Sequence, residues 1–149
     1  MASEILNNIK AAMKDAMRAK EKERLATIRL IQAEFKRVEV DERIELDDDR
    51  VIAILDKMVK QRRDSVRQYQ DAGREELAAI ELAEIDVIQT FLPTPLTEAE
   101  ISAMIDAAIA ETGAETMRDM GKVVGMLKGP MQGRADMAVV SKLVKDRLS

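Results

Sequence analysis

The sequence predicts an all-α protein in which N-terminal helical hairpins are followed by a small three-helix tail. Aromatic residues make up only 2% of the 149 residues, and helix-favouring Ala, Glu, Lys, Leu and Met are abundant. Apolar residues recur at intervals of three and four. The stretch 91–97, FLPTPLT, places two prolines within three residues and stops any helix there. We therefore expect two domains, at residues 1–92 and 97–149.

Four helices are expected before the prolines. They cover about 3–20, 21–40, 49–71 and 74–91. Three aspartates, 47–49, precede the third helix and suit the positive end of its dipole, and Gly73 suits a C-cap between the third and fourth helices. The apolar positions expected to face inward are Ile5, Ile9, Met13, Met17, Leu25, Ile28, Ile31, Phe35, Val38, Val51, Leu55, Met58, Val66, Tyr69, Leu77, Ile80, Val87, Ile88 and Phe91.

Two charged residues interrupt the apolar stripes of the third and fourth helices. If these helices fold back antiparallel about Gly73, Arg62 faces Glu84 and Val66 faces Ile80. We predict an ion pair between Arg62 and Glu84, because a partly buried pair can fix the register of a hairpin.

Three helices are expected in the tail, at about 97–112, 116–128 and 136–148. Thr97 followed by Glu100 predicts a capping box, and Asp136 is a suitable N-cap for the last helix. Gly129 and Pro130 are expected to end the middle helix.

The composition excludes several classes of site. The chain has no Cys and no His, which removes disulfides, thiolate metal sites and the usual general base. No spacing points to a catalytic residue, a metal site or a cofactor, and the aspartates at 47–49 lack the glycine and distal Glu of a calcium loop. No apolar run has the length of a membrane span or a secretory signal. We expect a cytoplasmic protein.

The net charge of −4 conceals segregated blocks. Residues 1–37 carry +4, residues 75–115 carry −10 with no Lys or Arg, and residues 116–149 carry +4. A second basic stretch, with Lys60, Arg63 and Arg67, is expected to pair with the acidic helix that follows it. Local basic faces can bind nucleic acid even in a weakly acidic chain.

The stretch 121–136, GKVVGMLKGPMQGRAD, holds four of the six glycines. It is not a phosphate loop, because no strand precedes it and Lys122 is followed by Val rather than Ser or Thr. Gly121 and Gly125, one turn apart, are expected to let a neighbouring helix approach closely. At Gly133 we expect a bend whose backbone N–H groups, beside Lys128 and Arg134, can hold a phosphate.

Lys142 and Lys145 on the last helix would extend this basic surface, although an ordinary solvated face is the alternative. With three aromatic residues expected inward, any RNA contact would be to the backbone rather than by base stacking.

Several motifs resemble the YqeY family along nearly the whole chain: MKDAMRAKEKERLATIRLI, KQRRDSVRQY with AGREEL, FLPTPLTEAEI, MGKVVGMLKGPMQGRAD and SKLVKDRL. This family shares its domain with the tail of the B subunit of tRNA-dependent amidotransferases, where the tail helps to recognise tRNA. The resemblance implies an all-α fold without the catalytic domain. It also implies a role for the positions that match the tail motif: Gly121, Lys122, Gly125, Gly133, Arg134 and Ala135, with Lys142 and Lys145. Gln132 departs from the family pattern, which has Lys there, and Gly129-Pro130 is also unusual.

These observations lead to a hypothesis of a non-catalytic protein that binds tRNA through Lys122, Lys128, Arg134, Lys142 and Lys145. The alternatives are an adaptor for a translation-related protein, using the acidic block and exposed apolar side chains, or an accessory in glutamine-dependent amide transfer.

Overall fold

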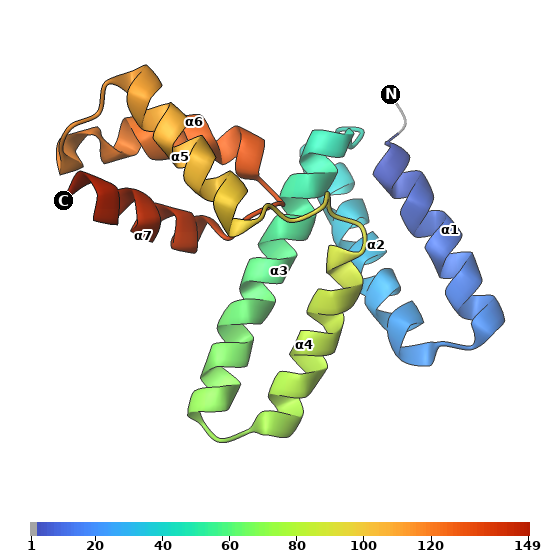
Figure 1. Ribbon diagram of the computed structural model, residues 1–149. Helices are drawn as coiled ribbons and strands as arrows, with labels where there is room; N and C mark the ends of the chain where they lie inside the picture. The colour runs from blue at the N-terminus through green and yellow to red at the C-terminus, as the bar shows by residue number, and fades with distance from the viewer. Residues whose placement is uncertain (1–2) are drawn as a thin grey trace. The chain divides into compact units, whose positions relative to one another are not determined.

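In a computed structural model that describes residues 3–149, the chain forms seven α-helices and one short 3-10 turn, with no strand among these residues (Figure 1). The predicted all-α fold is confirmed. The chain divides into two compact units, one ending at Leu92 (unit 1) and one beginning at Pro93 (unit 2). Each unit has its own apolar core.

Unit 1 consists of two helical hairpins. Helices α1 (Glu4–Ala19) and α2 (Lys22–Glu42) form the first, and α3 (Asp48–Asp71) and α4 (Glu75–Gln89) form the second (Figure 1). Gly73 adopts a left-handed φ of 72° just after the C-cap residue Ala72, which allows the tight turn into α4.

The predicted cap at the start of α3 is confirmed at Asp47, and the neighbouring Asp48 bonds to the start of α1. Asp47 accepts a hydrogen bond from the backbone N–H of Arg50 at 2.9 Å. The side chain of Asp48 accepts from the hydroxyl of Ser3 and, at 3.2 Å, from the backbone N–H of Ile5. Asp48 thereby ties the beginning of α1 to the beginning of α3.

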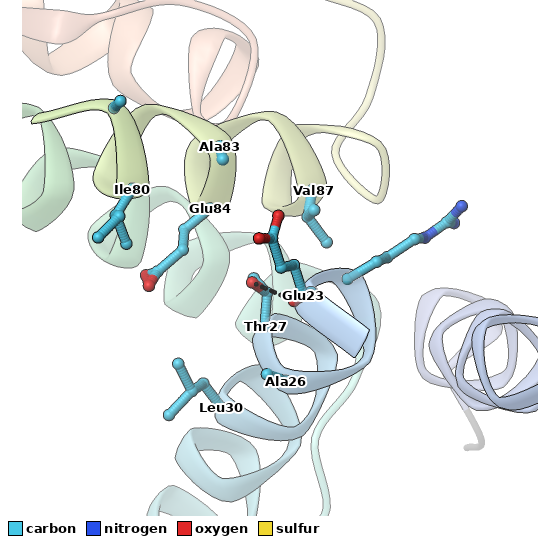
Figure 2. A pocket seen from close by; sticks show the side chains of 10 residues that line it. Glu23, Ala26, Thr27, Leu30, Ile80, Ala83, Glu84 and Val87 are labelled. Carbon is cyan, nitrogen blue, oxygen red and sulfur yellow. Dashed lines mark hydrogen bonds between the residues drawn. The ribbon is translucent and has the colours of Figure 1, made fainter. Parts of the chain in front are cut away.

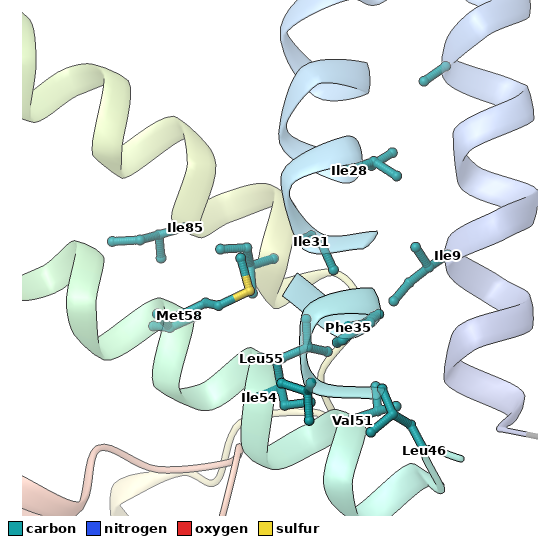
Figure 3. Packing of buried hydrophobic residues seen from close by; sticks show 14 of the residues in the cluster. Ile9, Ile28, Ile31, Phe35, Leu46, Val51, Ile54, Leu55, Met58 and Ile85 are labelled. Carbon is teal, nitrogen blue, oxygen red and sulfur yellow. The ribbon is translucent and has the colours of Figure 1, made fainter. Parts of the chain in front are cut away.

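The core of unit 1 lies between the two hairpins, as Figure 3 shows for Ile9, Ile28, Ile31, Leu55 and Met58. Most residues predicted to face inward are buried or packed against this core. Three are not: Met17 is 51% exposed, Ile80 is 57% exposed, and Leu77 is only partly buried and does not pack against the core. Helix α4 instead buries Ala78, Ile85 and Ile88. Its other apolar face, with Ile80, is turned away from the core, because the helix carries apolar residues on two sides.

The predicted ion pair is confirmed. The Nε of Arg62 donates to a carboxylate oxygen of Glu84 at 2.8 Å, and the side chains are only 15% and 20% exposed. Arg62 also donates to the backbone carbonyl of Met58. The carboxyl of the adjacent Glu81 has its pKa raised by burial and by the charge of Glu84, while Arg62 opposes the rise.

Unit 2 contains α5 (Glu98–Thr112), a 3-10 turn (Met117–Asp119), α6 (Met120–Met131) and α7 (Met137–Leu148). The predicted capping box of α5 is present, with Thr97 and Glu100 bonding each other's backbone N–H. Asp136 caps α7, as predicted.

The prediction that Gly129 and Pro130 end the middle helix is wrong. Helix α6 continues through both residues to Met131, which is fully buried. A proline removes one backbone donor and crowds the carbonyl four residues before it, but only Met131 follows Pro130 in α6, and the burial of Met131 favours completing that turn.

Candidate nucleic-acid interface

The glycines of α6 lie on an exposed face of the helix. Outside the neighbouring backbone of α6 itself, no heavy atom lies within 4 Å of the place that a Cβ would occupy at Gly121, Gly125 or Gly129. The expectation that Gly121 and Gly125 receive a neighbouring helix is therefore wrong. The opposite side of α6 packs against the core through Val123 and Leu127. The three glycines form a bare strip of helix backbone, which we call the glycine face.

Two predicted cations border the glycine face. Lys122 and Lys128 are exposed residues of α6, and the helical period of 3.6 residues places one at each edge of the strip. Lys122 is close enough to Asp119 to help lower the pKa of that carboxyl, after the larger effect of hydrogen bonds from the backbone N–H groups of Glu115 and Thr116. For Lys128 no ion pair is recorded within residues 3–149.

The bend between α6 and α7 does not present the predicted cradle of free amides. The backbone N–H groups of Arg134 and Ala135 both donate to the carbonyl of Met131, at 2.9 and 3.1 Å. Gly133 has a left-handed φ of 74°, which is the bend that was predicted. The amides of Arg134 and Ala135 close the bend and are therefore unavailable to a phosphate.

Arg134 makes structural hydrogen bonds that its sequence context does not indicate. Its Nε donates to the carbonyl of Thr94 at 2.9 Å, and its own carbonyl accepts from the N–H of Leu96 at 2.9 Å. These bonds hold the segment before α5 against the bend. The charge of Arg134 also contributes to lowering the pKa of Glu100, after the larger effect of the bonds to Thr97.

The remaining predicted cations lie on α7. Lys142 and Lys145 are exposed, on the side of the helix opposite the buried Val140 and Val144, and no ion pair is recorded for either of them within residues 3–149. Arg147 is different, because it pairs with Asp106 and donates to Ser102 on α5. Two lysines of α7 are thus available to a ligand, whereas the arginine fixes α7 to α5.

Unit 1 contains a groove that was not predicted. It has a volume of about 640 Å³ and runs between the first half of α2 and the middle of α4. Ala26, Leu30, Ile80, Ala83 and Val87 give it apolar walls, and the carboxylates of Glu23 and Glu84 project into it (Figure 2). The sequence feature that could have indicated this groove is the second apolar face of α4.

The described residues give no sign of a metal centre or a membrane span. Within residues 3–149, no group of three carboxylates lies close enough together to hold a metal ion. Over the same range, every helix is too short or too polar to cross a bilayer. The features that stand out are two surfaces: a glycine face between lysines, and an apolar groove.

Comparisons with known proteins match almost the whole chain. The model of the family described as "Yqey-like protein" matches residues 6–148. A curated relative from Pyrenophora tritici-repentis, "Altered inheritance of mitochondria protein 41, mitochondrial", is 33% identical over 95% of this chain and 80% of its own length. Relatives of the same name from Lachancea thermotolerans and Clavispora lusitaniae are 29% and 36% identical, over 89% and 59% of this chain and 75% and 51% of their own lengths.

These relatives correct one expectation. The sequence was expected to belong to a cytoplasmic protein, but the similar proteins are named as mitochondrial. The absence of a signal-like apolar stretch had been the ground for that expectation, and it does not distinguish these compartments. The cytoplasmic assignment is withdrawn.

Proposed function

The chain belongs to the YqeY family, and from that premise we propose that it binds tRNA through the glycine face of unit 2. The proposal takes its ligand from the resemblance of unit 2 to the tail of the amidotransferase B subunit, which helps to recognise tRNA. The family match itself covers the helices and says nothing of RNA.

One observation supports the proposal most directly: the glycine face is bare, exposed and bordered by Lys122 and Lys128. Three solvent-exposed glycines in one helix are costly, at about 1 kcal/mol each relative to Ala. No packing contact in unit 2 offsets this cost, since no neighbouring element approaches the three glycines. A sugar-phosphate backbone lying along the helix would use both the missing side chains and the flanking charges.

The structure changes which residues carry the proposal. Lys122 and Lys128 are central to it, and Lys142 and Lys145 supply additional charge. Gly133, Arg134 and Ala135 shape the bend, and their part in binding is to position α6 and α7.

We expect the chain to bind fluorescently labelled bulk tRNA with a micromolar or tighter Kd at about 50 mM salt, and more weakly as salt rises. Lys122→Glu/Lys128→Glu should weaken binding at least about tenfold, because two phosphate contacts become repulsions. Fluorescence anisotropy measures both.

The matched control reverses Lys57 and Lys60, two exposed lysines of α3, and should bind nearly as the wild type does. The absence of any binding at low salt would contradict the proposal. Equal weakening by the two double variants would contradict the assigned surface.

A second candidate function, an adaptor that binds a protein helix, is favoured by the groove between α2 and α4. Leu30 and Ile80 are 49% and 57% exposed at its walls, and exposed apolar surface in a concave site is typical of peptide recognition. Glu84 is already paired with Arg62, and Arg24 also lines the groove, so Glu23 is the carboxylate that would favour a Lys or Arg beside the apolar stripe of an amphipathic helix.

For this second function we expect Ile80→Glu to abolish co-purification of a protein partner from nuclease-treated lysate. Leu82→Glu is the matched control, since Leu82 is also exposed on α4 but does not line the groove. Quantitative mass spectrometry of the captured proteins measures the difference. Identical partner sets for the two variants would exclude the groove as a binding site.

A further inference from the structure

A second group of cations lies on the first hairpin, far along the sequence from the glycine face. On α1 these are Lys10 and Lys14, one turn apart. On α2 they are Lys22, Arg29 and Lys36, each seven residues from the next. A spacing of seven residues returns to nearly the same face of a helix. All five side chains are exposed, and we call this set the basic flank.

The two helices bring their cations to the same side of the hairpin. A shallow groove of about 300 Å³ between α1 and α2 is lined by Lys10 from one helix and by Gln32 and Lys36 from the other. Arg29 and Lys22 precede Lys36 on the same face of α2, and Lys14 follows Lys10 on α1. The set therefore forms one surface, with Glu39 as the single acidic residue in the groove lining.

The cations of the basic flank form no ion pairs within residues 3–149, unlike most arginines of unit 1. The residues up to Leu92 include 17 basic and 20 acidic side chains. With these numbers, most basic side chains of the unit would be expected to lie beside an acidic one. Six other arginines of the unit do pair with carboxylates: Arg24, Arg37, Arg50, Arg62, Arg67 and Arg74. For the five members of the basic flank, no ion pair is recorded within residues 3–149.

The arrangement suits an extended polyanion. A rise of 1.5 Å per residue separates Lys10 from Lys14 by about 6 Å and the three cations of α2 by about 10 Å each. Two parallel rows of charge can therefore follow a phosphate backbone over several nucleotides. The one aromatic residue in the groove lining, Phe35, is buried, so the contacts of this surface are with phosphates and sugars.

A membrane surface fits less well. Helices that lie on bilayers insert a continuous apolar stripe between their cations. The large apolar side chains exposed beside the basic flank are Met17 and Val40. They lie near the C-terminal ends of α1 and α2, which are opposite ends of this antiparallel hairpin (Figure 1).

We propose that the basic flank of α1 and α2 is a second surface for the phosphate backbone of RNA, independent of the glycine face. The inference rests on the proposed function in that RNA is the partner of the chain. It extends that function, because the ligand is then bound by both units rather than by unit 2 alone.

The experiment compares three double variants of the full chain in titrations of labelled bulk tRNA at several salt concentrations. The flank variant is Arg29→Gln/Lys36→Gln, the glycine-face variant is Lys122→Gln/Lys128→Gln, and the control is Lys57→Gln/Lys60→Gln. We expect the flank variant to bind about tenfold more weakly at 100 mM salt and to lower the slope of log K against log salt by about 1.5. The control should match the wild type, and circular dichroism should show equal folding for all.

The outcomes separate the two surfaces. A flank variant that binds as the wild type does, while the glycine-face variant is weakened, overturns the inference and leaves the proposed function standing. The reverse result supports the basic flank and overturns the glycine face. Absence of binding by the wild type overturns both. Vesicles containing anionic phospholipid provide the last arm: sedimentation with vesicles that requires Arg29 and Lys36, with RNA affinity unchanged, overturns the inference in favour of a membrane surface.

Discussion

Gly125→Leu is expected to weaken tRNA binding at least about tenfold while making unit 2 more stable. Gly125 is the middle residue of the glycine face, and a side chain there meets open space. Replacing a helical Gly by Leu gains about 0.8 kcal/mol of helix propensity. The same isobutyl group would stand between Lys122 and Lys128 and hold a phosphate backbone several ångströms away from both, which removes most of their attraction. Denaturant unfolding measures the first effect and fluorescence anisotropy the second.

Two further variants test whether the size of the side chain at position 125 causes the loss of affinity. Gly125→Ala should give a similar gain in stability, about 1 kcal/mol, with a much smaller loss of affinity because a methyl group projects less. Ala110→Leu places the same larger side chain on an exposed position of α5 and should leave binding unchanged. Unaltered affinity in Gly125→Leu would show that RNA does not approach this face. A loss of stability would show that the glycines are needed for folding.

The features that the sequence predicted correctly depend on local rules. The capping box at Thr97, the caps at Asp47 and Asp136 and the turn at Gly73 each involve residues within about three positions of one another. The pair of Arg62 and Glu84 is more distant in sequence but was still predictable. A tight turn fixes the register of a hairpin, and two charges in apolar stripes then have one plausible partner each.

The features that were missed depend on long-range packing. Gly121 and Gly125 fit a close helix contact and an open face equally well by sequence, and only the position of the neighbouring helices distinguishes these cases. The bond from Arg134 to Thr94 joins residues 40 positions apart, so no periodicity reveals it. Ile80 was wrongly predicted to face inward because α4 has apolar residues on two faces. Which of these faces packs against the core depends on the packing of all four helices of unit 1.

Arg62→Met is expected to produce the largest loss of stability among these variants, about 2 kcal/mol of unfolding free energy at pH 7. The change removes the partner of Glu84, whose side chain is only 20% exposed, and leaves its charge beside that of Glu81. Burial and Glu84 already raise the pKa of Glu81, and Arg62 opposes that rise. Without the guanidinium the pKa of Glu81 should rise further, so this carboxyl resists ionisation in the folded state beside the charge of Glu84. Urea denaturation of the variant and the wild type gives the difference.

Two further measurements test whether the lost ion pair is the cause of the lower stability of Arg62→Met. A carboxyl whose pKa is raised by folding binds its proton more tightly in the native state, so it stabilises the fold at low pH and this contribution is lost as pH rises through the folded pKa. The deficit of Arg62→Met should therefore shrink between about pH 7 and pH 4.5, where Glu begins to be protonated. The double variant Arg62→Met/Glu84→Leu should recover most of the loss, because an apolar pair replaces the ion pair without leaving a charge behind. If the double variant is as unstable as Arg62→Met and the deficit is the same at both pH values, then the loss comes from the packing of the arginine stem, and the ion pair is not what holds α3 against α4.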